Sequence, residues 1–305
     1  MHEPAAADFE TALAGRAARV EKLLRELLDD RPRSGEIARP ERLMAAIRHG
    51  VLNGGKRLRP FLVLESAALF EADGEAALRV AAALECVHCY SLIHDDLPAM
   101  DDDDLRRGQP TVHRAFDEAT AILAGDSLLS YAFDIIASNE TALSAAARAE
   151  LVLALARACG PGGMAGGQAL DLEAALKPPE EEGILTLQAM KTGALIRFAC
   201  EAGAIIGDAA PQDRERLAEF GSAIGLAFQL ADDLLDVTAD AESMGKATGK
   251  DAAAGKATLA ALHGVDWTRN QLFGLVEQAA LLLEPFGARA ALLIDAARYV
   301  ARRTT

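Results

Sequence analysis

Apolar residues recur at helical spacing along almost the whole chain. Leu13, Val20, Leu24 and Leu28 lie four or seven residues apart and predict an opening helix that ends at residues 29–32. The same period predicts further helices over 43–51, from Pro60 onward, and over 76–96, 113–137, 141–158, 181–206, 211–238 and 270–302. No alternating pattern long enough for a strand is present. The pattern therefore predicts an all-α protein.

The segments between these helices are short and rich in glycine or proline. They fall at 53–55, 160–167, 177–179 and 239–257, and none has the length or composition of a flexible linker. We therefore expect one domain over residues 1–305. Two predicted helices, around 80–94 and 220–231, are nearly free of charge, which indicates that they are buried centrally in a helix bundle.

Composition narrows the class of protein. Hydrophobic residues make up 51 % of the chain and aromatic residues only 5 %. The net charge of −15, from 31 basic and 46 acidic residues, argues against a nucleic-acid partner. No signal peptide and no membrane span of ~20 uninterrupted apolar residues is visible, so we expect a cytoplasmic protein. The cysteines do not suggest a secreted disulfide framework; they are Cys86, Cys89, Cys159 and Cys200.

Two clusters of aspartates each follow an apolar helical run. Residues 95–104 read Asp-Asp-Leu-Pro-Ala-Met-Asp-Asp-Asp-Asp, and residues 232–236 read Asp-Asp-Leu-Leu-Asp. Asp232 and Asp236 share one helical face, and Gln229 extends that stripe. Carboxylates this close repel one another, and an all-oxygen ligand set selects Mg²⁺. An acidic, solvated helix end is the alternative for either cluster alone, but two clusters in the same context favour a metal site.

The first cluster continues a polar stripe on its helix. Glu85, His88, Ser91 and Asp95 are three, three and four residues apart, so they share one face. Asp101 lies six residues beyond Asp95, a spacing that a regular helix would rotate off that face. Pro98 provides the local irregularity that would bring Asp101 back.

Basic residues stand close to both clusters. The loop Gly-Gly-Lys-Arg-Leu-Arg-Pro at 54–60 leads into a helix N-terminus, where cations and backbone N–H groups make an anion site. Lys191 lies in mid-helix, and Lys246, Lys250 and Lys256 follow the second cluster. For Lys250 we expect ordinary surface charge. The cations that flank the acids are better explained as a phosphate site; these are Lys56, Arg59, Arg106 and Arg107.

Taken together, these segments resemble the trans-prenyltransferase family, the short-chain polyprenyl diphosphate synthases. The resemblance extends from Gly54 to Arg303 and is closest to the bacterial farnesyl type. It rests on segments 54–60, 91–96 and 101–108, on Gly167 and Gln168 with Asp171, on 191–193, and on 228–229 with 232–236. The resemblance implies a bundle of long helices around a deep central cavity, the isoprenoid synthase type, usually as a homodimer.

The resemblance also implies a role for each matching residue. Asp95, Asp101 and Asp232 would ligate magnesium, three ions when diphosphate is bound, with support from Asp96, Asp233 and Asp236. The allylic diphosphate would be contacted by Arg106, Lys191, Thr192, Gln229, Lys246 and Lys256, near Gln168 and Asp171. Isopentenyl diphosphate would be held by Lys56, Arg59, His88 and Arg107. At Lys256 the chain reads Lys-Ala-Thr-Leu where many relatives have Lys-x-Thr-Tyr-Pro, which leaves the placement of Lys246, Lys250 and Lys256 open.

The implied reaction is the magnesium-dependent, head-to-tail condensation of isopentenyl diphosphate with C5 and C10 allylic diphosphates to farnesyl diphosphate. Tyr90 and Ser91 lie ~6–8 Å along the helix from Asp95, where an aromatic ring would form a cavity floor that limits product length. An ordinary core tyrosine is the alternative. A C20-forming geranylgeranyl diphosphate synthase and an inert partner subunit remain as other readings. A terpene cyclase or head-to-head condensing enzyme would not need the basic loop at 54–60.

Overall fold

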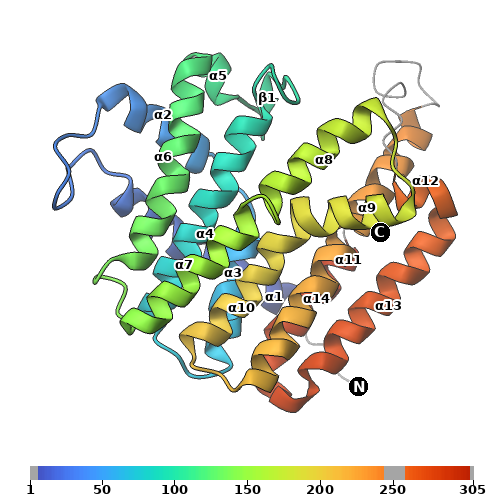
Figure 1. Cartoon of the computed structure of the whole chain (residues 1–305). Coiled ribbons are helices and arrows are strands. Elements are labelled where there is room, and N and C mark those ends of the chain that lie inside the picture. Colours follow the sequence, from blue (N-terminus) through green and yellow to red (C-terminus); the bar gives the residue numbers. More distant parts are fainter. Residues whose placement is uncertain (1–5, 244–257, 303–305) are drawn as a thin grey trace.

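The computed structural model describes residues 6–243 and 258–302, and helices make up most of this part of the chain (Figure 1). The first half contains α1 (Ala6–Leu27), α2 (Glu41–Val51), α3 (Leu58–Ala68), α4 (Gly74–Asp95), α5 (Val112–Ala115), α6 (Glu118–Ala137) and α7 (Ala145–Cys159). The second half contains α8 (Met164–Leu176), α9 (Glu181–Gln188), a π-helical turn η1 (Ala189–Gly193), α10 (Ala194–Ile206), α11 (Pro211–Ser243), α12 (Leu259–His263), α13 (Val265–Leu283), a 3₁₀ segment η2 (Glu284–Ala290) and α14 (Ala291–Arg302). The predicted all-α class is confirmed.

Local sequence explains where several helices begin. Alanine and leucine favour helix, and side-chain oxygens satisfy the first free N–H groups. Asp73 accepts hydrogen bonds from the backbone N–H groups of residues 75 and 76 at the start of α4. Asp117 and Ser144 accept equivalent bonds at the starts of α6 and α7. These caps fix the ends of helices whose interiors are then stabilised by packing.

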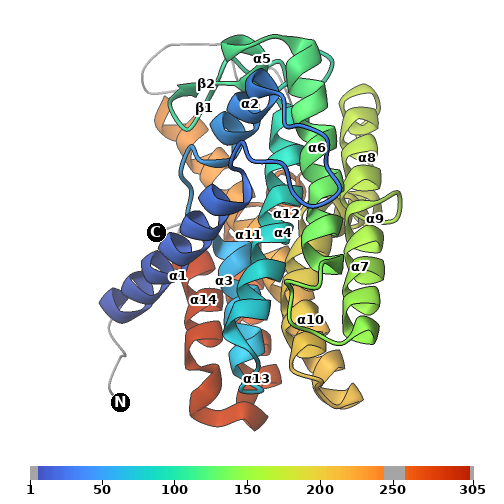
Figure 2. The ribbon, with the colours of Figure 1, turned by 90° about the vertical axis from the view of Figure 1, so that its left-hand side faces the viewer.

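The core is organised around α4 and α11, which run through the middle of the bundle in both views (Figures 1 and 2). α4 packs against α3 and α6, and α11 packs against α10 and α13. Leu84 and Val87 on α4 and Leu230 on α11 are at most 1 % exposed. Full burial of each such side chain contributes roughly 2 kcal/mol. The sequence expectation that these two segments are central is therefore confirmed.

Several helix boundaries differ from the sequence expectation. The segment predicted as one helix over 113–137 is divided by the extended residue Asp117, and the segment 270–302 is divided at η2, where Gly287 has a φ of 57°. Helix α8 was not predicted at all, because glycines at 160–167 read as loop signals. The described part of the chain also holds one hairpin of two-residue strands, β1 (Leu105–Arg106) and β2 (Gln109–Pro110), with Arg106 opposite Gln109.

Two of the described helices, Gly74–Asp95 and Glu118–Ala137, are long and apolar enough to cross a membrane by length and composition alone. Charged residues such as Glu85 in α4 and Asp126 in α6 interrupt both helices, so neither is an uninterrupted apolar run of ~20 residues. In α4, 78 % of the apolar window is buried inside the protein, as in the core helix of a bundle. In α6 only 39 % is buried, so this helix keeps an exposed apolar face.

Candidate active site

The first aspartate cluster is formed by the end of α4 and the turn that follows it. The helix ends at Asp95, and the backbone N–H of Asp101 donates to the carbonyl oxygen of Asp95 at 2.8 Å. This closed turn, which contains Pro98, brings Asp101 back toward Asp95 despite their six-residue separation. The irregularity predicted at this point is therefore present, and the two carboxylates belong to one cluster.

Burial makes the charge on this cluster costly. The pKa of Asp95 is raised to about 6, first by burial and then by the charge of Asp101, while Lys191 opposes the rise. A hard divalent cation relieves this kind of repulsion, so the donor set fits Mg²⁺. Among the described residues, no three carboxylate, imidazole or thiol groups are arranged to hold an ion by themselves. That arrangement suits Mg²⁺, which is commonly shared between one or two carboxylates and substrate phosphates.

Asp96 is more deeply buried than Asp95 and is paired with Arg106. It is 2 % exposed, and its Oδ1 accepts from Nε of Arg106 at 2.7 Å and lies 2.5 Å from Nη2. Burial raises the pKa of Asp96, although the bond from Arg106 lowers it. Asp96 therefore holds Arg106 beside the cluster, on the hairpin strand β1.

The second cluster lies on α11 and is tied to the π-helical turn by amide side chains. Asp233 is 2 % exposed and accepts from Nε2 of Gln188 at 3.0 Å and from Nε2 of Gln229 at 3.1 Å. Gln229 Oε1 in turn accepts from the hydroxyl of Thr192 at 3.2 Å. Asp232 is half-buried. Burial lowers the pKa of Arg59, and the charges of Glu85 and then Asp232 oppose that change, which places the second cluster toward the basic loop. The side chain of Asp236 lies outside the described residues.

The π-helical turn η1 interrupts what would otherwise be one helix from α9 to α10. It carries Lys191, whose Nζ lies 2.5 Å from Oδ2 of Asp171 on α8. A Cβ on Gly225 would lie 2.8 Å from the Cα of Gly193, and a Cβ on Gly167 would clash with the backbone of Lys191. Glycines on both neighbouring helices thus let them approach the turn. Such π-helical turns occur frequently at functional sites.

The basic loop before α3 faces the polar stripe of α4. Arg107 donates to Oδ1 of Asn53 at 3.1 Å and to the carbonyl oxygen of Gly54. Gly55 has a φ of 120°, which residues with a Cβ rarely adopt, and the guanidinium of Arg107 lies 2.6 Å from the place a Cβ would take. Burial, followed by the charge of Arg59, holds the pKa of His88 well below its usual range and keeps the imidazole neutral.

The predicted basic residues Arg59 and Lys56 differ in how far they are exposed to solvent. Arg59 is desolvated by its surroundings, which lowers its pKa, and its buried Nε has no partner among the described residues. Lys56 is exposed, and its Nζ lies 5.0 Å from the ring centre of Tyr299 on α14. Arg59 is therefore placed to meet an anion, whereas Lys56 rests on the rim of the site.

Other predicted site residues have these surroundings. Both amide atoms of Gln168 are buried without a partner among the described residues. The Tyr90 ring is 9 % exposed and lies 5.7 Å from the His94 ring, and burial raises the pKa of Tyr90 to about 12. Ser91 donates to the carbonyl oxygen of His88 at 2.9 Å. Lys246, Lys250 and Lys256 lie outside the described residues.

Sequence reasoning missed three residues that organise the site. Gln188 stands three residues before Lys191, a helical spacing that indicates a shared face. Arg57 and Glu85 were identified in the sequence only as members of the basic loop and of the polar stripe, and no contact between them was expected. Their side chains form a buried ion pair with an Nη1–Oε1 distance of 2.5 Å.

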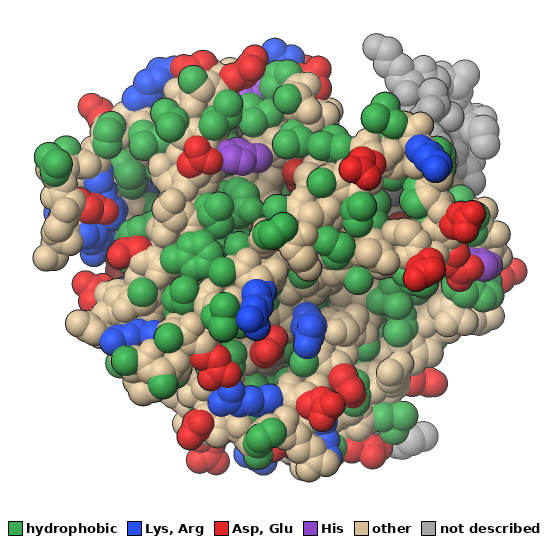
Figure 3. Space-filling model, viewed as in Figure 1, with side chains coloured by type: hydrophobic (Ala, Val, Ile, Leu, Met, Phe, Trp, Pro, Cys, Tyr) green, Lys and Arg blue, Asp and Glu red, His purple; other side chains and the backbone are tan. Residues whose placement is uncertain are grey.

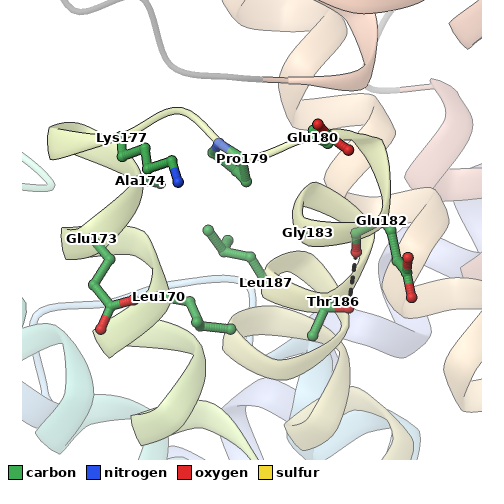
Figure 4. A pocket seen from close by; sticks show the side chains of 10 residues that line it. All are labelled: Leu170, Glu173, Ala174, Lys177, Pro179, Glu180, Glu182, Gly183, Thr186 and Leu187. Atoms are coloured by element: carbon green, nitrogen blue, oxygen red, sulfur yellow. Dashed lines mark hydrogen bonds between the residues drawn. The ribbon is translucent and has the colours of Figure 1, made fainter.

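A pocket of about 430 Å³ lies between α8 and α9 (Figure 4). Lys177 and Pro179 stand at one end, Leu170 and Thr186 at the other, and Glu173 and Glu182 point away from its centre. Its walls combine apolar and charged side chains, and its one cation, Lys177, is outnumbered by three glutamates. This pocket is therefore unsuited to a diphosphate and is separate from the aspartate clusters.

Comparison with solved structures defines the class of protein. The crystal structure of an FPP/GFPP synthase from Zymomonas mobilis superposes with a TM-score of 0.86 and 44 % sequence identity, covering 97 % of this chain and 100 % of that one. The helical fold is thus that of the isoprenoid diphosphate synthases.

Sequence comparison defines the family. The family model described as "Polyprenyl synthetase" matches residues 40–280. Farnesyl diphosphate synthase of Escherichia coli (strain K12) is 46 % identical over 78 % of this chain and 80 % of that protein. Geranylgeranyl pyrophosphate synthase 7, chloroplastic, of Arabidopsis thaliana is 38 % identical over 97 % of this chain and 84 % of that protein. The chain belongs to the polyprenyl synthetase family of prenyltransferases, whose enzymes depend on magnesium.

The raised pKa of Asp95 predicts a pH-dependent stability in metal-free protein. A carboxyl group that binds its proton more tightly in the folded state loses folding stability as pH rises from 3.8 to about 6. The Asp95→Asn variant cannot ionise at this position. Its unfolding temperature, relative to that of the unsubstituted protein, should therefore rise between pH 3.8 and about 6 and stay higher at more alkaline pH. Thermal unfolding in the presence of a chelator measures the difference.

Asp117→Asn serves as the control of opposite sign. Hydrogen bonds from Thr120 and Arg42 lower the pKa of Asp117 to about 2, so its contribution to stability is complete above about pH 5 and is lost as pH falls further. Between about pH 5 and 6 the difference between this variant and the unsubstituted protein should stay constant, whereas the difference for Asp95→Asn should still grow. A constant difference for Asp95→Asn as well would contradict the assignment of a raised pKa to Asp95.

Proposed function

We propose that the chain is a farnesyl diphosphate synthase, which condenses isopentenyl diphosphate head to tail with C5 and then C10 allylic diphosphates. The observation that carries this proposal is the pair of aspartate clusters, at Asp95 and at Asp232, set among cations on two sides. Lys191 and Arg106 stand beside the first cluster, and Arg59 stands between the second cluster and the polar stripe of α4. Two such groups of cations suit two diphosphates.

Each part of the site has a defined task in this reaction. Magnesium held by Asp95, Asp101 and Asp232 would neutralise a departing diphosphate, with Asp96, Asp233 and Asp236 in support. Lys191 and Arg106 add positive charge where the leaving group develops negative charge. Arg59, neutral His88 and Arg107 would orient isopentenyl diphosphate so that its alkene faces the allylic carbon. The proton lost after bond formation goes to the released diphosphate.

The allylic cation needs surroundings that stabilise it without reacting with it. Thr192 and Gln229 are neutral, and the hydrogen bond between them fixes both dipoles. The apolar side chains of α4 and α11 support a water-poor cavity between these helices. Three magnesium ions, a single domain over residues 1–305 and a cytoplasmic location are further parts of this proposal.

The other readings differ in what they would require of the site. Geranylgeranyl diphosphate synthase would need a cavity longer than Tyr90 allows, and the Arabidopsis relative keeps this C20 product as a second candidate. A cyclase or head-to-head enzyme would not require the basic loop around Arg59. An inert partner subunit would not be expected to keep both aspartate clusters.

The purified protein should convert isopentenyl diphosphate and a C5 or C10 allylic diphosphate into a C15 product only when Mg²⁺ is present. Chromatography of the dephosphorylated products measures chain length, and a parallel reaction with a C15 primer tests for further extension. Efficient extension to C20 would keep the mechanism and favour the second candidate. Absence of condensation with every primer would rule out the synthase and favour the inert subunit.

Replacement of Tyr90 should lengthen the product if its ring forms the floor of the cavity. Tyr90 is buried near the Asp95 end of α4 and close to Cys159 of α7, which is consistent with such a floor. Tyr90→Ala removes the ring and should shift the main product from C15 toward C20 or longer. Tyr90→Phe, which keeps the ring, should leave product length unchanged. Equal product lengths in the two variants would assign Tyr90 to the ordinary core.

The exposed apolar face of α6 supports a homodimer. Ile122 is 44 % exposed and Leu123 is 55 % exposed, and Leu153 on the neighbouring α7 is 50 % exposed. Hydrophobic side chains are visible on the face that α6 and α7 present in Figure 3. Exposed apolar surface of this kind marks association sites. Light scattering should give twice the mass of one chain, and Leu123→Glu should lower it to that of one chain; a monomeric unsubstituted protein would contradict the dimer.

A further inference from the structure

A buried ion pair joins the basic loop to the middle of α4. Arg57 Nη1 lies 2.5 Å from Oε1 of Glu85, and Arg57 Nη2 donates to the carbonyl oxygen of Val51 at 2.6 Å. The exposed fractions of the Arg57 and Glu85 side chains are 1 % and 2 %. Breaking such a pair leaves a buried charge without compensation, which is strongly unfavourable.

Arg57 also has an unusual backbone conformation. It is the residue that precedes α3, and its φ of 52° lies in the left-handed region. A residue with a Cβ adopts this region only when its surroundings hold it there. The bonds to Glu85 and Val51 provide that hold, so they determine the direction in which the loop enters α3.

The residues on either side of Arg57 are those proposed to meet isopentenyl diphosphate. Lys56 precedes it and Arg59 follows two residues later, while His88 lies three residues beyond Glu85 on α4. The charge of Glu85 acts on Arg59, and the charge of Arg57 acts on His88 and Arg107. The ion pair therefore lies beneath the anion site, with two nitrogens of Arg57 already occupied by Glu85 and Val51.

We propose that Arg57 and Glu85 are positioning residues for isopentenyl diphosphate: Glu85 fixes Arg57, and Arg57 fixes the loop so that Lys56 and Arg59 face the diphosphate. The proposal rests on the proposed function, because it assigns the anion at this site to that substrate. Neither residue is placed in contact with the substrate.

The direction in which KM for isopentenyl diphosphate changes in Glu85→Gln separates a positioning role from a simple electrostatic effect. The carboxylate of Glu85 repels a nearby diphosphate, so on charge alone Glu85→Gln would bind the substrate more tightly. If Glu85 acts by holding Arg57 and the loop, the same substitution weakens binding. A purely structural role would lower the fraction of folded protein and leave KM for both substrates unchanged.

Glu85→Gln should raise KM for isopentenyl diphosphate roughly tenfold, because it loosens the loop and leaves Arg57 without its partner. The KM for the allylic diphosphate and kcat should change by less than about twofold, since Lys191 and the aspartate clusters are untouched. Steady-state kinetics with each substrate varied in turn measure this difference. An unchanged or lowered KM for isopentenyl diphosphate would overturn the proposal.

Glu65→Gln is the matched control. Glu65 lies on α3, the helix that the basic loop enters, is 6 % exposed, and forms an ion pair with Nε of Arg16 at 2.6 Å. This substitution also removes the negative charge of a buried glutamate from an ion pair, but away from the loop. It should lower the unfolding midpoint and leave both KM values unchanged. A rise in KM equal to that of Glu85→Gln would show that general loosening of α3 is sufficient.

A double variant covers the case in which Glu85→Gln fails to fold. Arg57→Gln combined with Glu85→Gln removes both charges, so no buried charge remains uncompensated. It should fold and should still show the raised KM; a KM equal to that of the unsubstituted protein would overturn the proposal.

Calorimetric titration with isopentenyl diphosphate separates the two levels of proposal. Absence of turnover in the unsubstituted protein, together with binding that weakens in the double variant, would remove the synthase and keep the positioning role. Turnover in the unsubstituted protein, together with equal binding of isopentenyl diphosphate by both proteins, would keep the synthase and remove the positioning role.

Discussion

Repulsion between carboxylates, at the end of α4 and within α11, is the constraint on which the rest of the site depends. Asp95 and Asp101 are held together by a backbone hydrogen bond of 2.8 Å, and burial raises the pKa of Asp95 to about 6. Solvation relieves this repulsion only in part, because Asp101 is exposed but Asp95 is half-buried. The fold also places cations around these acids, and a bound divalent cation would remove most of the remaining cost. Binding of the metal is therefore favoured by the negative charge that is concentrated on these carboxylates, and binding of the substrate is linked to that charge through the metal.

The cations of the site fall into two kinds according to their partners. Arg57, Arg106 and Lys191 each form an ion pair with a fixed acid, namely Glu85, Asp96 and Asp171. Arg59 and Arg107 form no ion pair with an acid in the described ranges 6–243 and 258–302, and burial lowers the pKa of both. A diphosphate would supply the negative charge that these two lack. The cations that are paired with acids are thus held in fixed positions. The two that are not paired with an acid can each bind an anionic substrate.

The sequence was sufficient to predict the all-α class, the central helices and the grouping of acids with cations, because helical period and charge spacing are local properties. It was insufficient where tertiary packing decides. Helix α8 was missed because Gly163, Gly166 and Gly167 read as loop signals, whereas Gly166 and Gly167 allow close approach to η1 and Gly163 lies against the end of α7. The π-helical turn at Lys191 depends on Gly225 of α11, far along the chain. The partners of Arg57 and Asp233 depend on contacts 28 and 45 residues away.

The hydrogen bonds that Asp233 accepts from Gln188 and Gln229 determine how the amide of Gln229 is oriented. Because the ionised carboxylate of Asp233 has no proton to donate, it faces the amide nitrogens of Gln188 and Gln229, which donate to it. The carbonyl end of Gln229 is thereby turned toward Thr192, whose hydroxyl donates its only proton to it. The lone pairs of Thr192 Oγ1 are not used in that bond and remain able to face positive charge. One buried acid on α11 thus sets the dipoles of two neutral side chains, and this supports their proposed role beside an allylic cation.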